Sequence, residues 1–144
     1  MSKSIIYTSI FYLIVIELAI TEAAPQSDIK ELQNLLQALS ENCARKAKIS
    51  QHLATNIENG IFEDDAKSKA YVACNWLDST VIDEQGNLNE DILDHLCPPS
   101  KKPQLTNLII RCHKAQPKNQ SVEDIIYGMS KCIYPEDTTL FKIK

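Results

Sequence analysis

The sequence predicts an all-α domain built from about six short helices. Apolar residues recur at intervals of three and four, and residues that cap helices stand before these stretches. No stretch alternates convincingly between apolar and polar residues as a half-buried strand would. With 144 residues and no internal repeat, the chain is expected to form one domain with a core of its own.

The first 24 residues have the pattern of a secretory signal peptide. Lys3 precedes the apolar run 10–16, and Ala23 and Ala24 suit a cleavage site. A membrane anchor is the alternative, but Glu17 interrupts the run, which is also short for a bilayer span. We therefore expect residues 1–24 to be removed, leaving residues 25–144 as a single secreted domain without stable membrane insertion.

Two helices are expected at the start of the mature chain. Ser27 can cap the first, which leads to Cys43, and a second is expected to start at Ser50 and stop at Gly60. Their apolar positions at helical spacing are Leu32, Leu35, Leu36, Leu39, Leu53 and Ile57.

A central helix is expected over residues 66–78, after the acidic start at residues 63–65. It is apolar on two faces, which is typical of a helix with neighbours on both flanks. One face holds Ala66, Ala70, Cys74 and Leu77, and the other holds Val72 and Trp76. The residues that follow favour a turn, in which Gly86 is free to adopt a positive φ.

Three further helices are expected in the second half. Asn89 can cap a short one that ends at the proline pair 98–99, and Pro103 suits the first turn of the next. Ser121 can cap the last, which Pro135 closes. Their apolar positions are Ile92, Leu93, Leu96, Leu105, Leu108, Ile109, Cys112, Val122, Ile125, Met129 and Cys132.

Charge and residue pattern exclude several classes of function. The net charge is −4 and no basic patch stands out, so a nucleic-acid partner is not expected. No Ser or Cys stands with a placed His and carboxylate, so we expect neither catalysis nor a cofactor. If Gly86 is aligned with the obligatory glycine of a calcium loop, Val81 and Ile92 fall where carboxylates must stand.

The five cysteines predict two disulfides and one leftover thiol. All follow the signal peptide, in a chain expected to reach an oxidising compartment, and the residues leave the pairing open. His95 and Cys97 near Cys112 and His113 suggest zinc, but no four-ligand spacing is present and Cys112 is better used in a disulfide. We expect no metal site.

The cysteine spacing and the turn at residues 82–88 resemble those of insect odorant-binding proteins of the pheromone- and general-odorant-binding type. Cys43, Cys74, Cys112 and Cys132 match the first, third, fourth and sixth cysteines of that family. The second and fifth positions, which bond to each other in the family, hold Ala70 and Glu123. Both are lost together, as in the subclass called minus-C.

The resemblance implies the bridges Cys43–Cys74 and Cys112–Cys132. Cys97 departs from the pattern, and we favour an unpaired thiol there over an intermolecular bridge. The resemblance also implies that the helices surround an apolar cavity. The candidate ligand-binding residues are Leu36, Leu39, Leu53, Ile57, Phe62, Val72, Trp76, Leu93, Leu108, Ile125, Met129 and Phe141. Core packing is the alternative role for each of them.

Three tyrosines are candidates to orient a polar end of the ligand: Tyr71, Tyr127 and Tyr134. The alternative is that their hydroxyls reach solvent. His52, His95 and His113 are expected on the surface, although the resemblance makes histidine a trigger for release in mild acid. Asn119 begins a glycosylation sequon whose use the sequence leaves open.

We therefore expect a secreted carrier that reversibly binds a small apolar molecule, such as an odorant, a pheromone or another lipid. Residues 136–144, with Leu140 and Phe141, are a candidate lid over the pocket. The resemblance leaves an olfactory receptor and homodimerisation open as further interactions. The alternative function is that of a secreted effector or interaction protein of saliva, venom or reproductive fluid, built on the same scaffold.

Overall fold

The computed structural model describes residues 25–138, without the side chains of residues 25–29 and 32. The expected signal peptide and the end of the tail lie outside this range. The chain divides into two units, Met1–Leu32 and Gln33–Lys144. The first unit contributes the start of one helix, and the contacts described below belong to the second.

The described part of the chain contains six helices and no strand, which confirms the all-α prediction. Their bounds are α2 Pro25–Ala47, α3 Gln51–Glu58, α4 Ala66–Asp78, α5 Glu90–Leu96, α6 Lys102–Lys114 and α7 Val122–Ile133. None of these helices has the length and apolarity that crossing a bilayer requires.

The helix starts follow from local capping. The side chains of Ser50, Asn89 and Ser121 accept hydrogen bonds from backbone N–H groups of the first turns of α3, α5 and α7. The prediction for the first helix was wrong, because α2 already begins at Pro25 and Ser27 lies within it. Proline suits the first turn of a helix, because the N–H groups of that turn have no acceptor within the helix and proline therefore loses no hydrogen bond.

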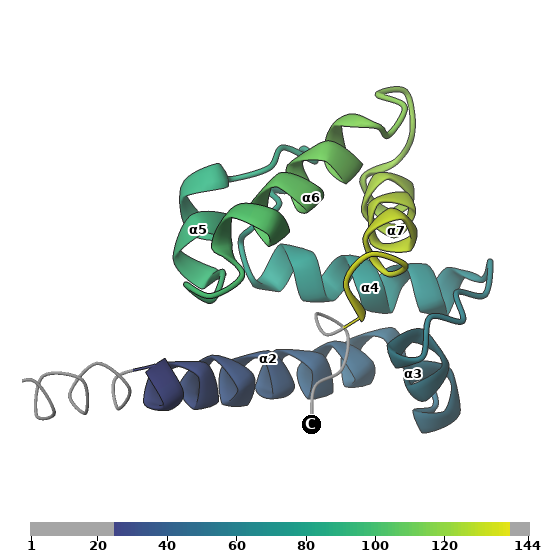
Figure 1. Ribbon diagram of the computed structural model, residues 1–144. Coiled ribbons are helices and arrows are strands. Elements are labelled where there is room, and N and C mark those ends of the chain that lie inside the picture. The colour runs from purple at the N-terminus through teal and green to yellow at the C-terminus, as the bar shows by residue number, and fades with distance from the viewer. Residues whose placement is uncertain (1–24, 139–144) are drawn as a thin grey trace, which may run out of the picture. The chain divides into compact units, whose positions relative to one another are not determined.

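Helix α4 lies at the centre of the contact pattern of the second unit. It contacts α3 and packs most extensively against α7, while α6 contacts both α5 and α7 (Figure 1). Disulfides join Cys43 of α2 to Cys74 of α4, and Cys112 of α6 to Cys132 of α7. These are the pairings that the family resemblance implies. Each of these helices is therefore fixed to a neighbour by packing, by a covalent bond or by both.

In two helices the predicted apolar positions form only part of the face that meets the core. Val72 and Met129 are buried, and Trp76, Leu77, Val122 and Cys132 are partly buried against the core. The buried residues of α4 are Ser68, Tyr71, Val72 and Ala73, whereas Ala66 is exposed. In α7 Ile126 is fully buried, whereas its neighbour Ile125, which was predicted to face the core, is only half-buried. Small and polar residues give a weak periodic signal, so the face they cover depends on which neighbour packs there.

The turn between α4 and α5 is held against the helices. Gly86 has φ +84°, and His113 Nε2 of α6 donates a hydrogen bond to its carbonyl oxygen at 2.8 Å. Ile82 forms an isolated antiparallel bridge with Leu88. Val81 and Ile82 enter the core, where they are 3% and 0% exposed. This turn, expected from its polar residues, is thus also part of the apolar interior.

Candidate functional site

Seven of the twelve predicted lining residues belong to one apolar cluster. They come from α3, α4, α5, α6 and α7 and from the segment between α3 and α4. Ile57, Val72, Leu93, Leu108 and Met129 are buried, and Phe62 and Trp76 are partly buried against them. The sequence pattern therefore selected residues that meet in space.

The other five do not join that cluster in the described part of the chain. Leu36 and Leu39 of α2, Leu53 of α3 and Ile125 of α7 are half-buried. Phe141 lies outside the described residues. The half-buried leucines of α2 give the inner part of that helix an apolar side that solvent still reaches.

Trp76 is fixed by a polar contact inside this apolar region. Its Nε1 donates a hydrogen bond to Ser130 Oγ at 3.1 Å, and that hydroxyl donates to the carbonyl oxygen of Ile126 at 2.9 Å. Ser130 is fully buried, so its hydroxyl requires such partners. The indole ring is thereby held in a set orientation between α4 and α7, against the buried apolar cluster.

An aromatic cluster stands at the α3–α4 side of the core. The ring of Phe62 meets Tyr127 edge-on, with centroids 5.5 Å apart, and meets Tyr134 in the same manner at 6.0 Å. Gly60, at φ +81°, lies directly under the Tyr134 ring, since a Cβ there would be 2.1 Å from the ring atom Cε1. Only glycine fits this close approach.

Two of the three candidate tyrosines already use their hydroxyls within the protein. Tyr71 Oη and Ser40 Oγ lie 2.6 Å apart, and Tyr127 Oη donates to the carbonyl oxygen of Glu63. Burial, with nearby carboxylates, raises the pKa of Tyr127 to about 12. Both side chains are buried, so the alternative that their hydroxyls reach solvent was wrong for these two, and their ligand-orienting role stays a prediction. The sequence missed this because both partners are distant along the chain.

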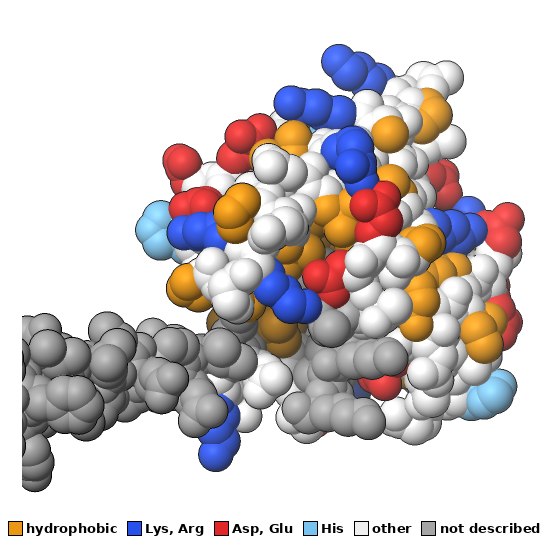
Figure 2. Space-filling view, viewed as in Figure 1, with side chains coloured by type: hydrophobic (Ala, Val, Ile, Leu, Met, Phe, Trp, Pro, Cys, Tyr) orange, Lys and Arg blue, Asp and Glu red, His pale blue; other side chains and the backbone are white. Residues whose placement is uncertain are grey.

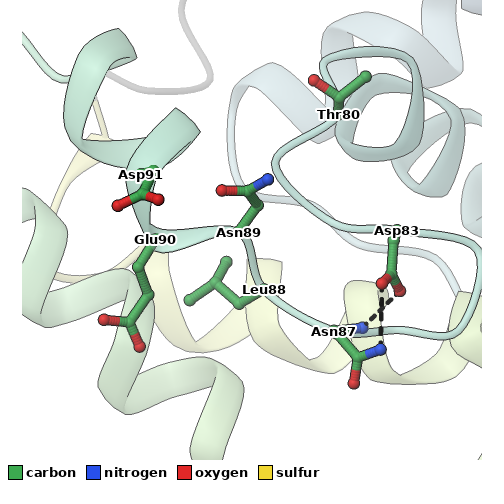
Figure 3. Close-up of a pocket in the computed structure, with 7 residues that line it drawn as sticks. All are labelled: Thr80, Asp83, Asn87, Leu88, Asn89, Glu90 and Asp91. Carbon is green, nitrogen blue, oxygen red and sulfur yellow. Dashed lines mark hydrogen bonds between the residues drawn. The ribbon is translucent and has the colours of Figure 1, made fainter.

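A shallow depression of about 420 Å³ opens at the turn between α4 and α5, and it is mostly polar (Figure 3). Figure 3 shows Asp83 and Asn87 joined by hydrogen bonds on one side of it and Glu90 and Asp91 on the other. Bonds from the backbone and side chain of Asn87 lower the pKa of Asp83. The lining contains none of the twelve predicted residues: Thr80, Asp83, Asn87, Leu88, Asn89, Glu90 and Asp91.

The remaining reactive side chains do not form a chemical site in the described region. Cys97 has no disulfide partner and is 6% exposed, and burial raises the pKa of its thiol, which disfavours the nucleophilic thiolate. One group of potential metal ligands was found there, Cys43, Cys74 and Asp78, but both sulfurs are in a disulfide.

The three histidines differ in exposure. His52 and His95 are exposed, as predicted, whereas His113 is half-buried and bonded to the turn. A donor N–H serves that bond in either charge state, so protonation of His113 does not by itself remove it.

Several core residues were missed by the sequence argument. Ile126 and Ile133 of α7 are fully buried, as is Ile82 of the turn after α4. Ile126, Met129 and Ile133 are spaced by three and four, so this register was available as a signal. It was hidden by the equally periodic set Val122, Ile125, Met129 and Cys132, in which Cys132 is placed by its disulfide.

Comparison with known proteins gives a consistent result. The model of the family described as PBP/GOBP matches residues 26–136. Among solved structures, the chain is similar to Apis mellifera odorant binding protein 5, with a TM-score of 0.66 and 18% sequence identity. That match covers 80% of this chain and 96% of the honeybee protein. A comparison with curated protein sequences found no match.

Proposed function

The protein belongs to the PBP/GOBP family, and on this basis we propose that it is a secreted carrier that reversibly binds a small hydrophobic molecule. The family match over residues 26–136 carries the proposal, and the fold agrees with it. The ligand class we propose is an odorant, a pheromone or another apolar lipid. We propose no chemistry, cofactor or nucleic-acid partner.

The proposed ligand site is the apolar region formed by the predicted lining residues. The side chains that form this region are almost entirely hydrocarbon or aromatic, which suits a ligand bound by burial of apolar surface. Met129 would allow the site to adapt to its ligand, because an unbranched thioether side chain can move to accommodate ligands of different shapes. Trp76, fixed by Ser130, gives the region an internal fluorescent reporter.

We further propose the subtype that lacks the second and fifth family cysteines. The positions concerned are Ala70 on α4 and Glu123 on α7, and their sequence neighbours support this register. Lys69 Nζ lies 3.0 Å from Asp124 Oδ1, which brings the two helices together beside those positions. Cys97 is buried at the C-terminal end of α5 and has no disulfide partner.

We propose secretion through removal of residues 1–24, with residues 25–144 acting as one domain. The two disulfides and the family relationship support this route. A receptor or a second copy of the chain is a further partner that the proposal allows. We also propose that ligand affinity falls as pH is lowered from neutral to mildly acid. Equal affinities at the two pH values would contradict this pH dependence.

The tail is proposed as a lid, with Leu140 and Phe141 outside the described residues. Its base is held by two ion pairs: Arg111 Nη2 lies 2.6 Å from Glu136 Oε1, and Lys101 Nζ lies 3.5 Å from Asp137 Oδ2. Removing residues 139–144 leaves these pairs intact, so it tests the apolar end alone. We expect faster ligand release from that truncation in stopped-flow measurements. Unchanged affinity and release would contradict the lid.

The carrier proposal is tested by titrating the purified mature protein with an environment-sensitive apolar fluorophore. Volatile alcohols, esters and fatty acids are then added to displace it. Saturable binding with selective displacement, accompanied by a change in Trp76 emission, is expected. A Trp76→Phe variant keeps an apolar ring at that position, so saturable binding of the probe should remain while the intrinsic signal is lost. No binding by a protein with both disulfides formed would overturn the proposal.

The effector alternative requires a contiguous exposed apolar surface. Leu35 and Ile61, at 52% and 54% exposed, are the large exposed hydrophobic residues found in the described region, on α2 and after α3. On the face shown in Figure 2, hydrophobic side chains are interrupted by charged and polar ones. Glandular instead of antennal expression, together with failure of the titration, would favour this alternative.

A further inference from the structure

The loop between α6 and α7 carries a sequence whose chemistry the carrier function does not use. Asn119-Gln120-Ser121 is the one Asn-X-Ser/Thr sequence in the chain. Proline at the middle position would block its use, and that position holds glutamine. The sequence therefore meets the requirement for an N-linked glycosylation acceptor.

The loop presents this sequence to solvent on a fixed base. Residues 117–121 are all exposed, and the loop extends beyond the ends of the two helices (Figure 1). Gln116 Nε2 donates to the carbonyl oxygen of Cys112 at 3.0 Å. The Gln116 side chain also covers Gly128 of α7, where a Cβ would lie 2.2 Å from its Oε1. The base is thus packed and the tip is open.

We propose that Asn119 carries an N-linked glycan. This inference rests on the secretory part of the proposed function, because the reaction takes place in the secretory pathway. Nδ2 of Asn119 attacks the anomeric carbon of a lipid-pyrophosphate-linked oligosaccharide. The new C–N bond replaces the C–O bond to pyrophosphate, Nδ2 loses one proton, and the lipid pyrophosphate leaves.

Ser121 serves both this modification and the fold, at different times. In the folded protein its Oγ accepts a bond from Asp124 N at 3.1 Å and lies 2.7 Å from Asp124 Oδ2, to which it donates. A glycosylation sequon requires this hydroxyl, which is bonded to Asp124 once Ser121 caps α7. The glycan is added before α7 closes, while the chain is entering the secretory pathway.

The glycan should leave ligand binding unchanged. Residues 116–121 contain none of the twelve candidate ligand-binding residues, and Asn119 is exposed. A bulky hydrated sugar at this tip keeps the α6–α7 loop in solvent and prevents it from being buried in a protein interface.

The test is secretion of the full chain from insect cells, followed by intact mass measurement before and after treatment with an N-glycan-removing amidase. The expected result is a glycan mass that the amidase removes, converting Asn119 to Asp. Asn119→Gln should lack this mass and keep the same affinity for the apolar fluorophore. Ser121→Thr retains both the sequon and the cap, so it should remain glycosylated.

The controls separate this inference from the proposed function. Asn107→Gln, at an exposed asparagine of α6 outside any sequon, should keep the glycan. Secreted protein with two disulfides and no amidase-sensitive mass would overturn the inference while leaving the carrier intact. If the full chain is not secreted, the secretory part of the proposed function fails. The chain is then secreted with a standard secretory leader in place of residues 1–24. An amidase-sensitive mass on that protein would support glycosylation of Asn119, and its absence would overturn it.

Discussion

The two ends of α7 are attached to their neighbours by different kinds of bond. Near the C-terminal end, Cys132 is joined to Cys112 of α6 by a disulfide. In the first turn, Asp124 instead forms an ion pair with Lys69 of α4, which also pairs with Asp64 at 2.8 Å. One end is covalent, and the other is electrostatic and open to water.

The two attachments should respond differently to salt and to pH. A disulfide acts mainly on the unfolded chain and is indifferent to salt and to moderate pH. An exposed ion pair is weakened by salt and disappears when its carboxylate is protonated. The C-terminal half of α7 should therefore stay fixed under conditions that loosen its first turn.

Removing the covalent attachment should have the largest effect. The Cys112→Ala/Cys132→Ala double variant releases a bridge with a sequence separation of 20 residues. Loop-entropy estimates put the loss at about 3 kcal/mol in the free energy of unfolding. Urea unfolding monitored by Trp76 fluorescence measures it. A double variant as stable as the parent would show that packing alone holds α6 to α7.

Making the weaker end covalent should raise stability by a comparable or smaller amount. Ala70→Cys/Glu123→Cys introduces cysteines at the two positions that we propose correspond to the missing bridge of the family. We expect them to oxidise together and raise Tm, because α4 and α7 approach each other at the adjacent pair Lys69–Asp124. Two free thiols in the folded double variant would mean that the proposed register and subtype are wrong.

Deleting the ion pair should produce a smaller change that depends on salt. Lys69→Met leaves Asp64 and Asp124 near each other without their shared cation, so Tm should fall at low ionic strength. The difference from the parent should shrink as salt is added. Lys67→Met, at an exposed lysine nearby on α4, is the matched control. Equal losses from both variants would argue against the pair.

Acid should weaken the same ion pairs by protonating their carboxylates. This change in Tm should be the smallest of the four, because it is absent near neutral pH. A bond from Ser121 and then one from Lys69 lower the pKa of Asp124 below its ordinary value of 3.8, and Lys69 likewise lowers that of Asp64. A carboxyl with a lowered folded pKa contributes stability above its unfolded pKa and loses it as pH falls through the folded value. Tm should thus stay level between pH 7 and about 5, then decline below about 4. A decline centred near pH 6 would point to histidine instead.

The starts of α3, α5 and α7 could be predicted because their causes are local. Ser50, Asn89 and Ser121 lie next to the turns that they cap, so the sequence contains both partners. The attachments of α7 required other information. The disulfide was predicted only from resemblance to a family. The ion pair between Lys69 and Asp124 joins residues 55 positions apart, which no local pattern indicates.

The interior was predictable in kind but only partly in detail. Val72 and Met129 were selected from spacing and are buried, whereas Ser68 was not selected, and Tyr71 was selected only for its hydroxyl; both are buried as well. Their burial depends on partners in other elements, such as Ser40 for Tyr71. The choice between a filled core and a ligand cavity likewise depends on packing, which spacing does not specify.

The most direct test of the carrier account is to enlarge a proposed lining residue and measure affinity and stability together. Met129→Phe is compared with Ile126→Phe, since both positions are fully buried on α7 and only Met129 is a proposed lining residue. If Met129 faces room for a ligand, its variant loses affinity for the apolar fluorophore while Tm is maintained. Ile126→Phe should instead lose about 1–3 kcal/mol of stability through overpacking. Equal destabilisation by both, with no binding by the parent protein, would contradict the account.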